Sequence, residues 1–117
     1  MSTRMSIPPT TTGQATALAM AMPGAEQKSH FENVDFRVRN KIFASFTYPD
    51  MMTLKLDPEH ARMLIGTDSD TYALHQGVWG QRGWIRVTLS RIAADELADL
   101  IHESWSRVAP KRIQVSN

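Results

Sequence analysis

Apolar side chains recur with the period of an α-helix near both ends of the chain. Near the start they predict a helix over residues 13–22, which Pro23 and Gly24 end. Near the end they predict a helix over residues 94–108, whose first turn carries two acids that suit the helix dipole. The apolar positions are Ala15, Leu18, Ala19 and Met22 in the first helix and Leu97, Leu100, Ile101, Trp105 and Val108 in the last.

A third helix is predicted from its start signal. Asp57 can cap the helix, Pro58 has the backbone angle of a first helical residue, and Glu59 adds an acid to the first turn. We expect this helix to run to about Ile65 and to end before Gly66. The segment that follows, residues 68–76, is expected to be a connection.

Between the helices the period changes to two, which is typical of strands with one buried face. The positions expected to face the core are Met52, Leu54 and Leu56 in one strand and Ile85, Val87 and Leu89 in another. Residues 36–43 predict a hairpin that turns at Arg39 and Asn40, because asparagine tolerates the left-handed conformation of such turns. The predicted pairs are Phe36 with Phe43, Arg37 with Ile42, and Val38 with Lys41.

This order of elements predicts an α+β two-layer sandwich. An antiparallel sheet would carry the N- and C-terminal helices on one face, with the short middle helix in addition. The 117 residues fit one domain, which we place at residues 13–117. Residues 1–12 are polar, contain two adjacent prolines, and are expected to form a loose tail.

Composition narrows the classes of protein that the chain can represent. With 42% hydrophobic residues and 21% charged residues, the composition is typical of a globular protein. The net charge is +1, so the total charge does not predict a nucleic-acid partner. The absence of cysteine excludes disulfides, thiolate catalysis and cysteine-ligated zinc. The apolar run at residues 15–22 is too short to span a bilayer, so we expect a soluble, cytoplasmic protein with no membrane partner.

No catalytic or metal-binding pattern is recognisable. The four histidines, His30, His60, His75 and His102, lack the spacing of metal ligands, and no glycine-rich phosphate loop is present. The serines have no neighbouring histidine and acid that would form a local triad pattern. We therefore expect a protein without enzymatic activity, without a metal and without a cofactor.

Five short motifs resemble the MmcQ/YjbR-like family, over residues 14–112. They are PGAE at 23–26, FRVRNKIFA at 36–44, LKLDPE at 54–59, GW at 83–84 and SWSRVAPKR at 104–112. The resemblance implies a fold similar to that of CyaY and frataxin, with two helices on a curved antiparallel sheet. It also implies DNA binding in which loops at the sheet edges act as a pair of wings. The chain departs from the family at Asn40, where glycine is usual, and at Trp105, where tyrosine is expected.

We do not expect this chain to bind iron as frataxin-like proteins do. Those proteins use an acidic first helix, whereas residues 13–22 contain no carboxylate.

Acidic and basic residues are segregated along the chain. Residues 57–70 hold four acids and one base, and residues 95–103 hold four acids and no base. If the helices cover one face of the sheet, the outward strand positions present a basic face, which can bind a polyanion even at low net charge. The residues predicted to bind nucleic acid, DNA in the first instance, are Arg37, Arg39, Lys41, Lys55, Trp79, Gln81, Arg82 and Arg86.

The two tryptophans of residues 77–91 have different expected roles. Trp84 begins a strand and is expected to anchor it to the core. Residues 79–82 are expected to project, so that Trp79 is available to stack on a base. Because no recognition helix is evident, the expected binding is weak and non-specific, with a dissociation constant on the order of 10⁻⁴ to 10⁻⁶ M.

Three other interpretations stay open. Lysine and arginine on exposed strands also discourage edge-to-edge pairing, without any ligand. The same face would suit a protein partner, with Trp79 as an aromatic anchor. A small anion could bind in a pocket beside Arg37, Lys41 and Trp84.

Overall fold

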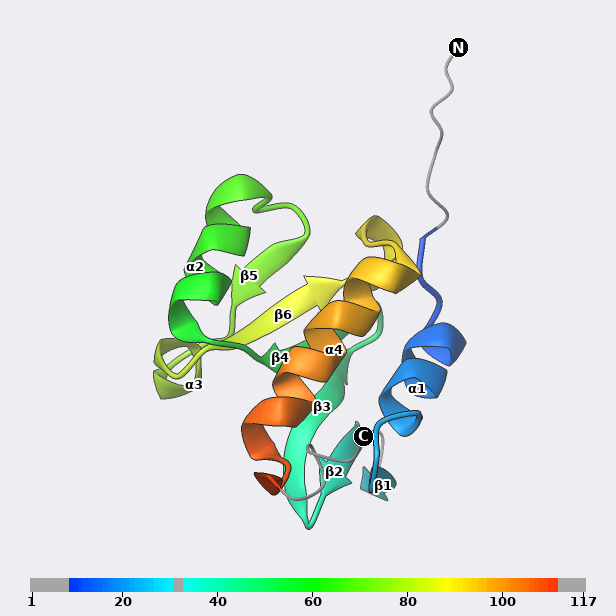
Figure 1. Ribbon diagram of the computed structural model, residues 1–117. Helices are drawn as coiled ribbons and strands as arrows, with labels where there is room; N and C mark the ends of the chain where they lie inside the picture. Colours follow the sequence, from blue (N-terminus) through cyan, green and yellow to red (C-terminus); the bar gives the residue numbers. More distant parts are fainter. Residues whose placement is uncertain (1–8, 31–32, 112–117) are drawn as a thin grey trace.

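Strand alternation divides a six-stranded antiparallel sheet into an apolar face and an open face. The computed structural model describes residues 9–30 and 33–111 (Figure 1). The sheet has the order β1-β2-β3-β4-β6-β5. In chain order the elements are α1 (Thr12–Met20), β1 (Glu26–His30), β2 (Asn33–Val38), β3 (Lys41–Tyr48), β4 (Met51–Lys55), α2 (Pro58–Thr67), β5 (Tyr72–Leu74), α3 (Val78–Gln81), β6 (Trp84–Thr88), a 3-10 turn (Leu89–Arg91) and α4 (Ala94–Val108).

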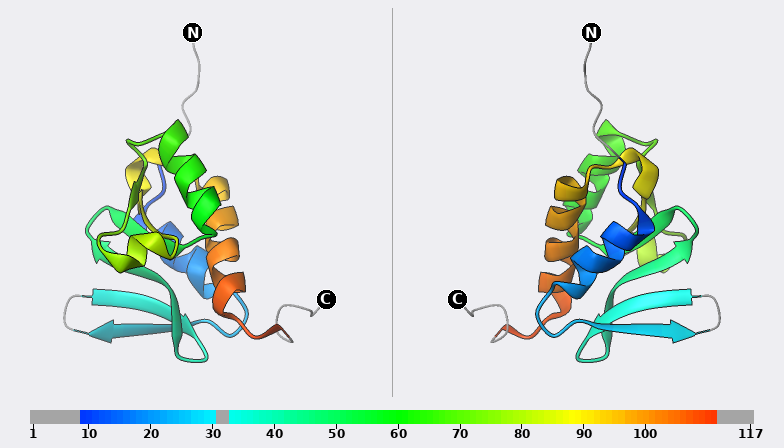
Figure 2. Two further views of the ribbon diagram at one scale, coloured as in Figure 1. Left: turned by 90° about the vertical axis from the view of Figure 1, so that its left-hand side faces the viewer. Right: turned by 90° about the vertical axis from the view of Figure 1, so that its right-hand side faces the viewer.

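Helices α1 and α4 pack against each other on one side of the sheet (Figure 2). Helix α4 lies over β3 and β4, and α2 contacts β5 and β6 at one end of the sheet. The predicted α+β sandwich, with its terminal helices on one face, is confirmed. The opposite face of the sheet carries neither α1 nor α4 and holds the candidate site.

Local capping signals set where α1 and α2 begin. In α1, Thr11 and Gln14 form a reciprocal capping box, and in α2 the Asp57 carboxylate accepts from the backbone N–H groups of Glu59 and His60. The predicted span of α4 is confirmed at both ends. The predicted ends of the other two helices are wrong: α1 stops at Met20, and α2 continues through Gly66 to Thr67.

The expected tail and the expected connection both contain ordered backbone. Residues 1–8 of the tail lie outside the described residues. Thr10 is buried, and its N–H and hydroxyl both donate to the carbonyl of Ile92, at 3.1 and 2.7 Å. The connection predicted at 68–76 is wrong in part, because its middle forms the edge strand β5. Three residues are too few to show a period, and pairing with β6 defines this strand.

The β2–β3 hairpin turns where the sequence predicts. Arg39 and Asn40 have φ angles of 52° and 67°, the left-handed values of a two-residue hairpin turn. The pairs of Arg37 with Ile42 and of Val38 with Lys41 are confirmed. The pairing of Phe36 with Phe43 is wrong, because a bulge shifts the register and pairs Phe36 with Ala44. The extra residue lets Phe43 and Ala44, although consecutive, both be fully buried.

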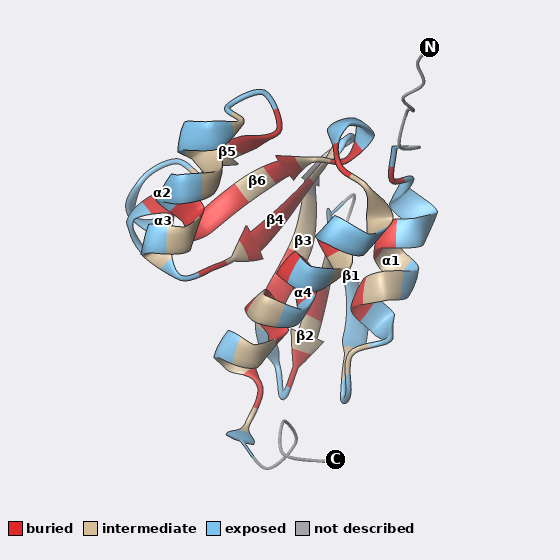
Figure 3. Ribbon diagram, turned by 45° about the horizontal axis from the view of Figure 1, so that its top comes forward, coloured by how far each residue is buried: buried red, intermediate tan, exposed pale blue. Residues whose placement is uncertain are grey.

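The core lies between the sheet and the terminal helices. Figure 3 shows buried residues along β4 and β6 and on the side of α4 that faces them. Trp105 of α4 is buried as predicted, and its indole N–H donates to the Pro23 carbonyl at 2.9 Å. The fully buried apolar side chains include Phe36, Phe43, Met52, Leu54, Leu56, Ile85, Val87, Leu89, Leu97 and Ile101, so the predicted inward positions of both strands are confirmed.

A buried serine of α4 joins two strands. The Ser104 hydroxyl accepts from the Lys55 backbone N–H at 2.8 Å and donates to the Phe43 carbonyl at 2.5 Å. These two backbone groups lie one position beyond the paired residues Ala44 and Leu54. The hydroxyl therefore takes the place of a direct bond between the strands and fixes the end of β4 that carries Lys55.

Candidate nucleic-acid interface

The strand register defines which side chains share the open face. Residues that pair across antiparallel strands point to the same side. Ser45, Thr53 and Arg86 form one such row across β3, β4 and β6, and Lys55 lies beside Trp84 in the next row. These positions alternate with the fully buried Leu54 and Ile85, so they lie on the face opposite the helices.

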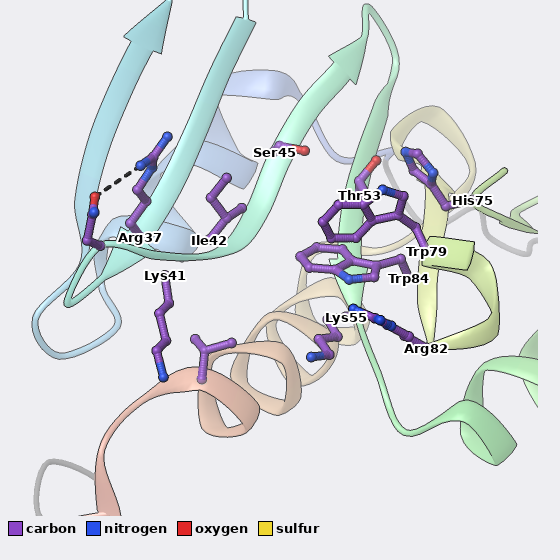
Figure 4. A pocket seen from close by; sticks show the side chains of 12 residues that line it. Arg37, Lys41, Ile42, Ser45, Thr53, Lys55, His75, Trp79, Arg82 and Trp84 are labelled. Carbon is purple, nitrogen blue, oxygen red and sulfur yellow. Dashed lines mark hydrogen bonds between the residues drawn. The ribbon is translucent and has the colours of Figure 1, made fainter. Parts of the chain in front are cut away.

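A hollow of about 490 Å³ opens on this face (Figure 4). Ile42, Ser45 and Thr53 supply its surface from β3 and β4, and the two indoles of residues 79 and 84 bound it near α3 (Figure 4). Among the lining residues that the structure describes, none carries a carboxylate. The complete lining is Arg37, Asn40, Lys41, Ile42, Ser45, Thr53, Lys55, His75, Trp79, Arg82, Trp84 and Val108.

The indoles of Trp79 and Trp84 meet edge to face in the hollow. Their ring centroids are 5.5 Å apart and their planes are inclined by 75°. Trp79 is 52% exposed, and Gln81 and Arg82 are exposed too, so the prediction that residues 79–82 project is confirmed except at Gly80, which is buried. Trp84 is buried, at 8% exposure, but it does not anchor β6 to the core as predicted. Its place in the alternation puts it on the open face, where Trp79 packs against it.

Of the four lysine and arginine side chains that line the hollow, three form no ion pair with a carboxylate of the described residues. They are Lys41 at the start of β3, Lys55 at the end of β4, and Arg82 in the turn before β6. In Figure 4 their side chains lie along the lower side of the hollow, away from Ser45 and Thr53. Positive charge without a neutralising partner in a recess without acids favours a negatively charged ligand.

Arg37 differs from these three cations because Asp35 neutralises it. Its guanidinium donates to both carboxylate oxygens of Asp35, at 2.8 and 3.1 Å, and to the side-chain oxygen of Asn40 at 3.0 Å. The hydrogen bond that Arg37 donates to the Asp35 carboxylate raises the pKa of Arg37 above its already high ordinary value. The pair also places an acid on the open face, so the predicted confinement of acids to the helical layer is incomplete.

The other predicted contact residues lie beside the hollow. Arg39 is exposed at the tip of the β2–β3 hairpin. Arg86 lies in the row with Thr53, and its guanidinium donates to the Leu74 carbonyl at 3.3 Å. Gln81 is exposed and lines a second depression, of about 380 Å³, together with Arg62 and Gly80.

Thus the fold brings Arg37, Lys41, Lys55, Trp79 and Arg82 together around one recess.

Several lining residues were not predicted from the sequence as site residues. Ser45 and Thr53 follow from the strand alternation once the pairing of β3 with β4 is known. His75 and Val108 have no such signal, because His75 follows the short edge strand and Val108 ends α4. Hydroxyl, amide and cationic groups suit an anion rather than a metal ion. Within residues 9–30 and 33–111 no three histidine or acidic side chains are grouped to hold a metal.

In the same ranges no helix has the length and apolar character to span a membrane.

Comparison with known proteins shows the family of the chain. The family model described as YjbR matches residues 20–107. The chain belongs to the YjbR family. Within this YjbR-family chain the matched span contains every residue that lines the hollow except Val108. The predicted resemblance is therefore confirmed.

A solved structure agrees with the fold of this YjbR-family chain. The crystal structure of Deinococcus radiodurans protein DR2400, described with the family-model domain DUF419, is similar to it with a TM-score of 0.73. The two share 22% sequence identity over 86% of this chain and 80% of the other. At that identity the likeness concerns the fold alone. A comparison with curated proteins finds no match.

Proposed function

We propose that this YjbR-family chain binds nucleic acid through the open face of its sheet, without catalysing a reaction. The observation that supports this proposal is that Lys41, Lys55 and Arg82 line one recess together with two indoles. Cations neutralise phosphates, and aromatic rings stack on bases, so the two kinds of group together suit a nucleic acid.

The complex depends mainly on charge and is therefore weak and sensitive to salt. Contacts to phosphates carry no sequence information, and the hydrogen-bonding groups on this face are few. Helix α4 carries Asp95 and Glu96 in its first turn, which is unfavourable for insertion into a groove lined by phosphates. We expect a dissociation constant on the order of 10⁻⁴ to 10⁻⁶ M near physiological salt.

A charge-matched pair of variants tests the proposal. Lys41→Glu/Lys55→Glu reverses two cations of the hollow, whereas Arg62→Glu/Arg91→Glu makes the same change in net charge at residues that do not line it. Anisotropy of a labelled DNA is measured across a salt series, with circular dichroism as the control for folding. The first variant is expected to lose at least about tenfold in affinity and to flatten the slope of log K against log salt by roughly 2. Equal losses in both variants, or no binding by the native protein at low salt, would refute the proposal.

A protein partner is the second candidate, and one observation favours it. Leu74, Val78 and Trp79 expose large apolar side chains around α3, at 45%, 58% and 52%. Exposed apolar groups with an aromatic member are typical of a binding hot spot for proteins. Co-purification of one defined protein that survives high salt and is lost in Trp79→Ala would favour this function, since phosphate contacts weaken under the same conditions.

A further inference from the structure

We infer that the hollow receives one unpaired nucleobase, so that the protein prefers single-stranded nucleic acid to a duplex. This inference rests on the proposed function and adds which form of nucleic acid is bound and where the base sits. The observation that supports it is that aromatic and hydroxyl side chains line one part of the hollow, whereas cations line another side.

The aromatic part has an indole available for stacking. Trp79 presents about half of its surface to solvent, while Trp84 packs edge to face against it at 5.5 Å and holds it in place. The edge-to-face contact leaves the Trp79 ring partly uncovered on the side of the hollow, where Figure 4 shows both indoles. A base stacked on an indole removes apolar surface from water and tolerates any sequence, because every base has an aromatic face.

The recess fits a base that has left its stack. Its volume of about 490 Å³ lies within the range of small-ligand sites, roughly 300–1,000 Å³. Thr53, which lines the recess, is only 3% exposed, so a group must enter the hollow to reach it. In a duplex each base is stacked on both faces and paired at its edge, so moving it into the hollow requires free energy for unstacking and unpairing. An unpaired base in a single strand does not require the unpairing part of this free energy.

The cations lie where the backbone of such a strand would pass. Lys41, Lys55 and Arg82 come from three separate segments and line one side of the hollow in Figure 4. Lys55 pairs across the strands with Trp84, and Arg82 precedes Trp84 by two residues, so the cationic side of the recess adjoins the indoles. A groove with cations for the backbone beside rings for the bases is how proteins bind single strands without sequence preference.

The test separates stacking from charge. A labelled single-stranded 12-mer and its duplex are titrated into the native protein, Trp79→Ala and Trp79→Phe at one low salt concentration. Val78→Ala is the matched control, because Val78 is the exposed neighbour of Trp79 in α3 and does not line the hollow. We expect the native protein to bind the single strand at least about fivefold more tightly than the duplex. Trp79→Ala is expected to bind the single strand with an affinity lower by roughly tenfold or more, and to bind the duplex with little change in affinity. The affinity of Trp79→Phe for the single strand is expected to lie between those of Trp79→Ala and the native protein.

The possible outcomes distinguish this inference from the proposed function. If the native protein binds the single strand and the duplex equally well, and Lys41→Glu/Lys55→Glu loses affinity for both, the inference is overturned and the proposed function stands. Failure of the native protein to bind either form would overturn both. Adenosine monophosphate is titrated as a competitor, because a free nucleotide offers the same base and phosphate. Displacement of the 12-mer by the mononucleotide at the concentration at which the 12-mer itself binds would identify a nucleotide site and overturn the preference for a strand.

Discussion

Replacement of Ser104 by alanine is expected to destabilise the protein more than its small size suggests. The Ser104 side chain is fully buried and bonds to the Lys55 N–H and the Phe43 carbonyl at 2.8 and 2.5 Å. Alanine leaves both backbone groups without this partner, at a position where Ser104 itself is fully buried. These are the two strands on which Lys41 and Lys55 lie, so the bond also holds part of the candidate site.

The magnitude follows from the number of groups that are left unsatisfied. A buried donor or acceptor that loses its partner costs roughly 1–3 kcal/mol. Alanine regains at most about 0.7 kcal/mol from its higher helix propensity. Two lost bonds therefore predict a decrease of about 1–5 kcal/mol in the free energy of unfolding. For a chain of this length that corresponds to a fall on the order of 10 °C in Tm.

Urea denaturation followed by tryptophan fluorescence measures the effect, and Ser106→Ala is the control. Ser106 lies on the same helix, is only partly buried, and its hydroxyl donates to the Glu103 carbonyl of the preceding turn at 2.7 Å. The control is expected to change stability by less than about 0.5 kcal/mol. If the two variants unfold at the same urea concentration, the strands close their own bond without Ser104, and the reasoning is refuted.

Two further predictions concern backbone strain and pH. Gly83→Ala is expected to lower the free energy of unfolding by roughly 2–4 kcal/mol, because Gly83 has φ of 98° and a Cβ there would overlap the Leu56 carbonyl. Gly77 has φ of 73° and open space around it, so Gly77→Ala should lower the free energy of unfolding by only about 1 kcal/mol. Thermal denaturation measures both. Equal decreases in the two variants would contradict the argument that a Cβ at Gly83 overlaps the Leu56 carbonyl. Burial, followed by the hydrogen bond to Glu96, raises the pKa of Tyr72. The folded state then keeps a proton that the unfolded state releases, so stability is full below pH ~10 and falls above it. Melting of the native protein and Tyr72→Phe between pH 8 and 11 should show the steeper fall in the native protein.

Much of the fold is local in origin and follows from the sequence. The span of α4, the start of α2 at Asp57 and the turn at Arg39 and Asn40 depend on residues a few positions apart. Alternation along β4 likewise identifies its inward side chains, which are all fully buried. The hairpin register is predicted only up to the bulge, because the extra residue depends on how Phe43 packs under α4 and not on the pattern within β3.

The candidate site depends on strand order and was only partly predictable. The sequence by itself determined that basic residues alternate with buried ones in the strands, since periodicity is a property of neighbours along the chain. Tertiary structure alone decided that β4 pairs with β6, which puts Lys55 beside Trp84. Pairing between distant strands is set by the packing of the whole core, and no local pattern encodes which cations then share one recess.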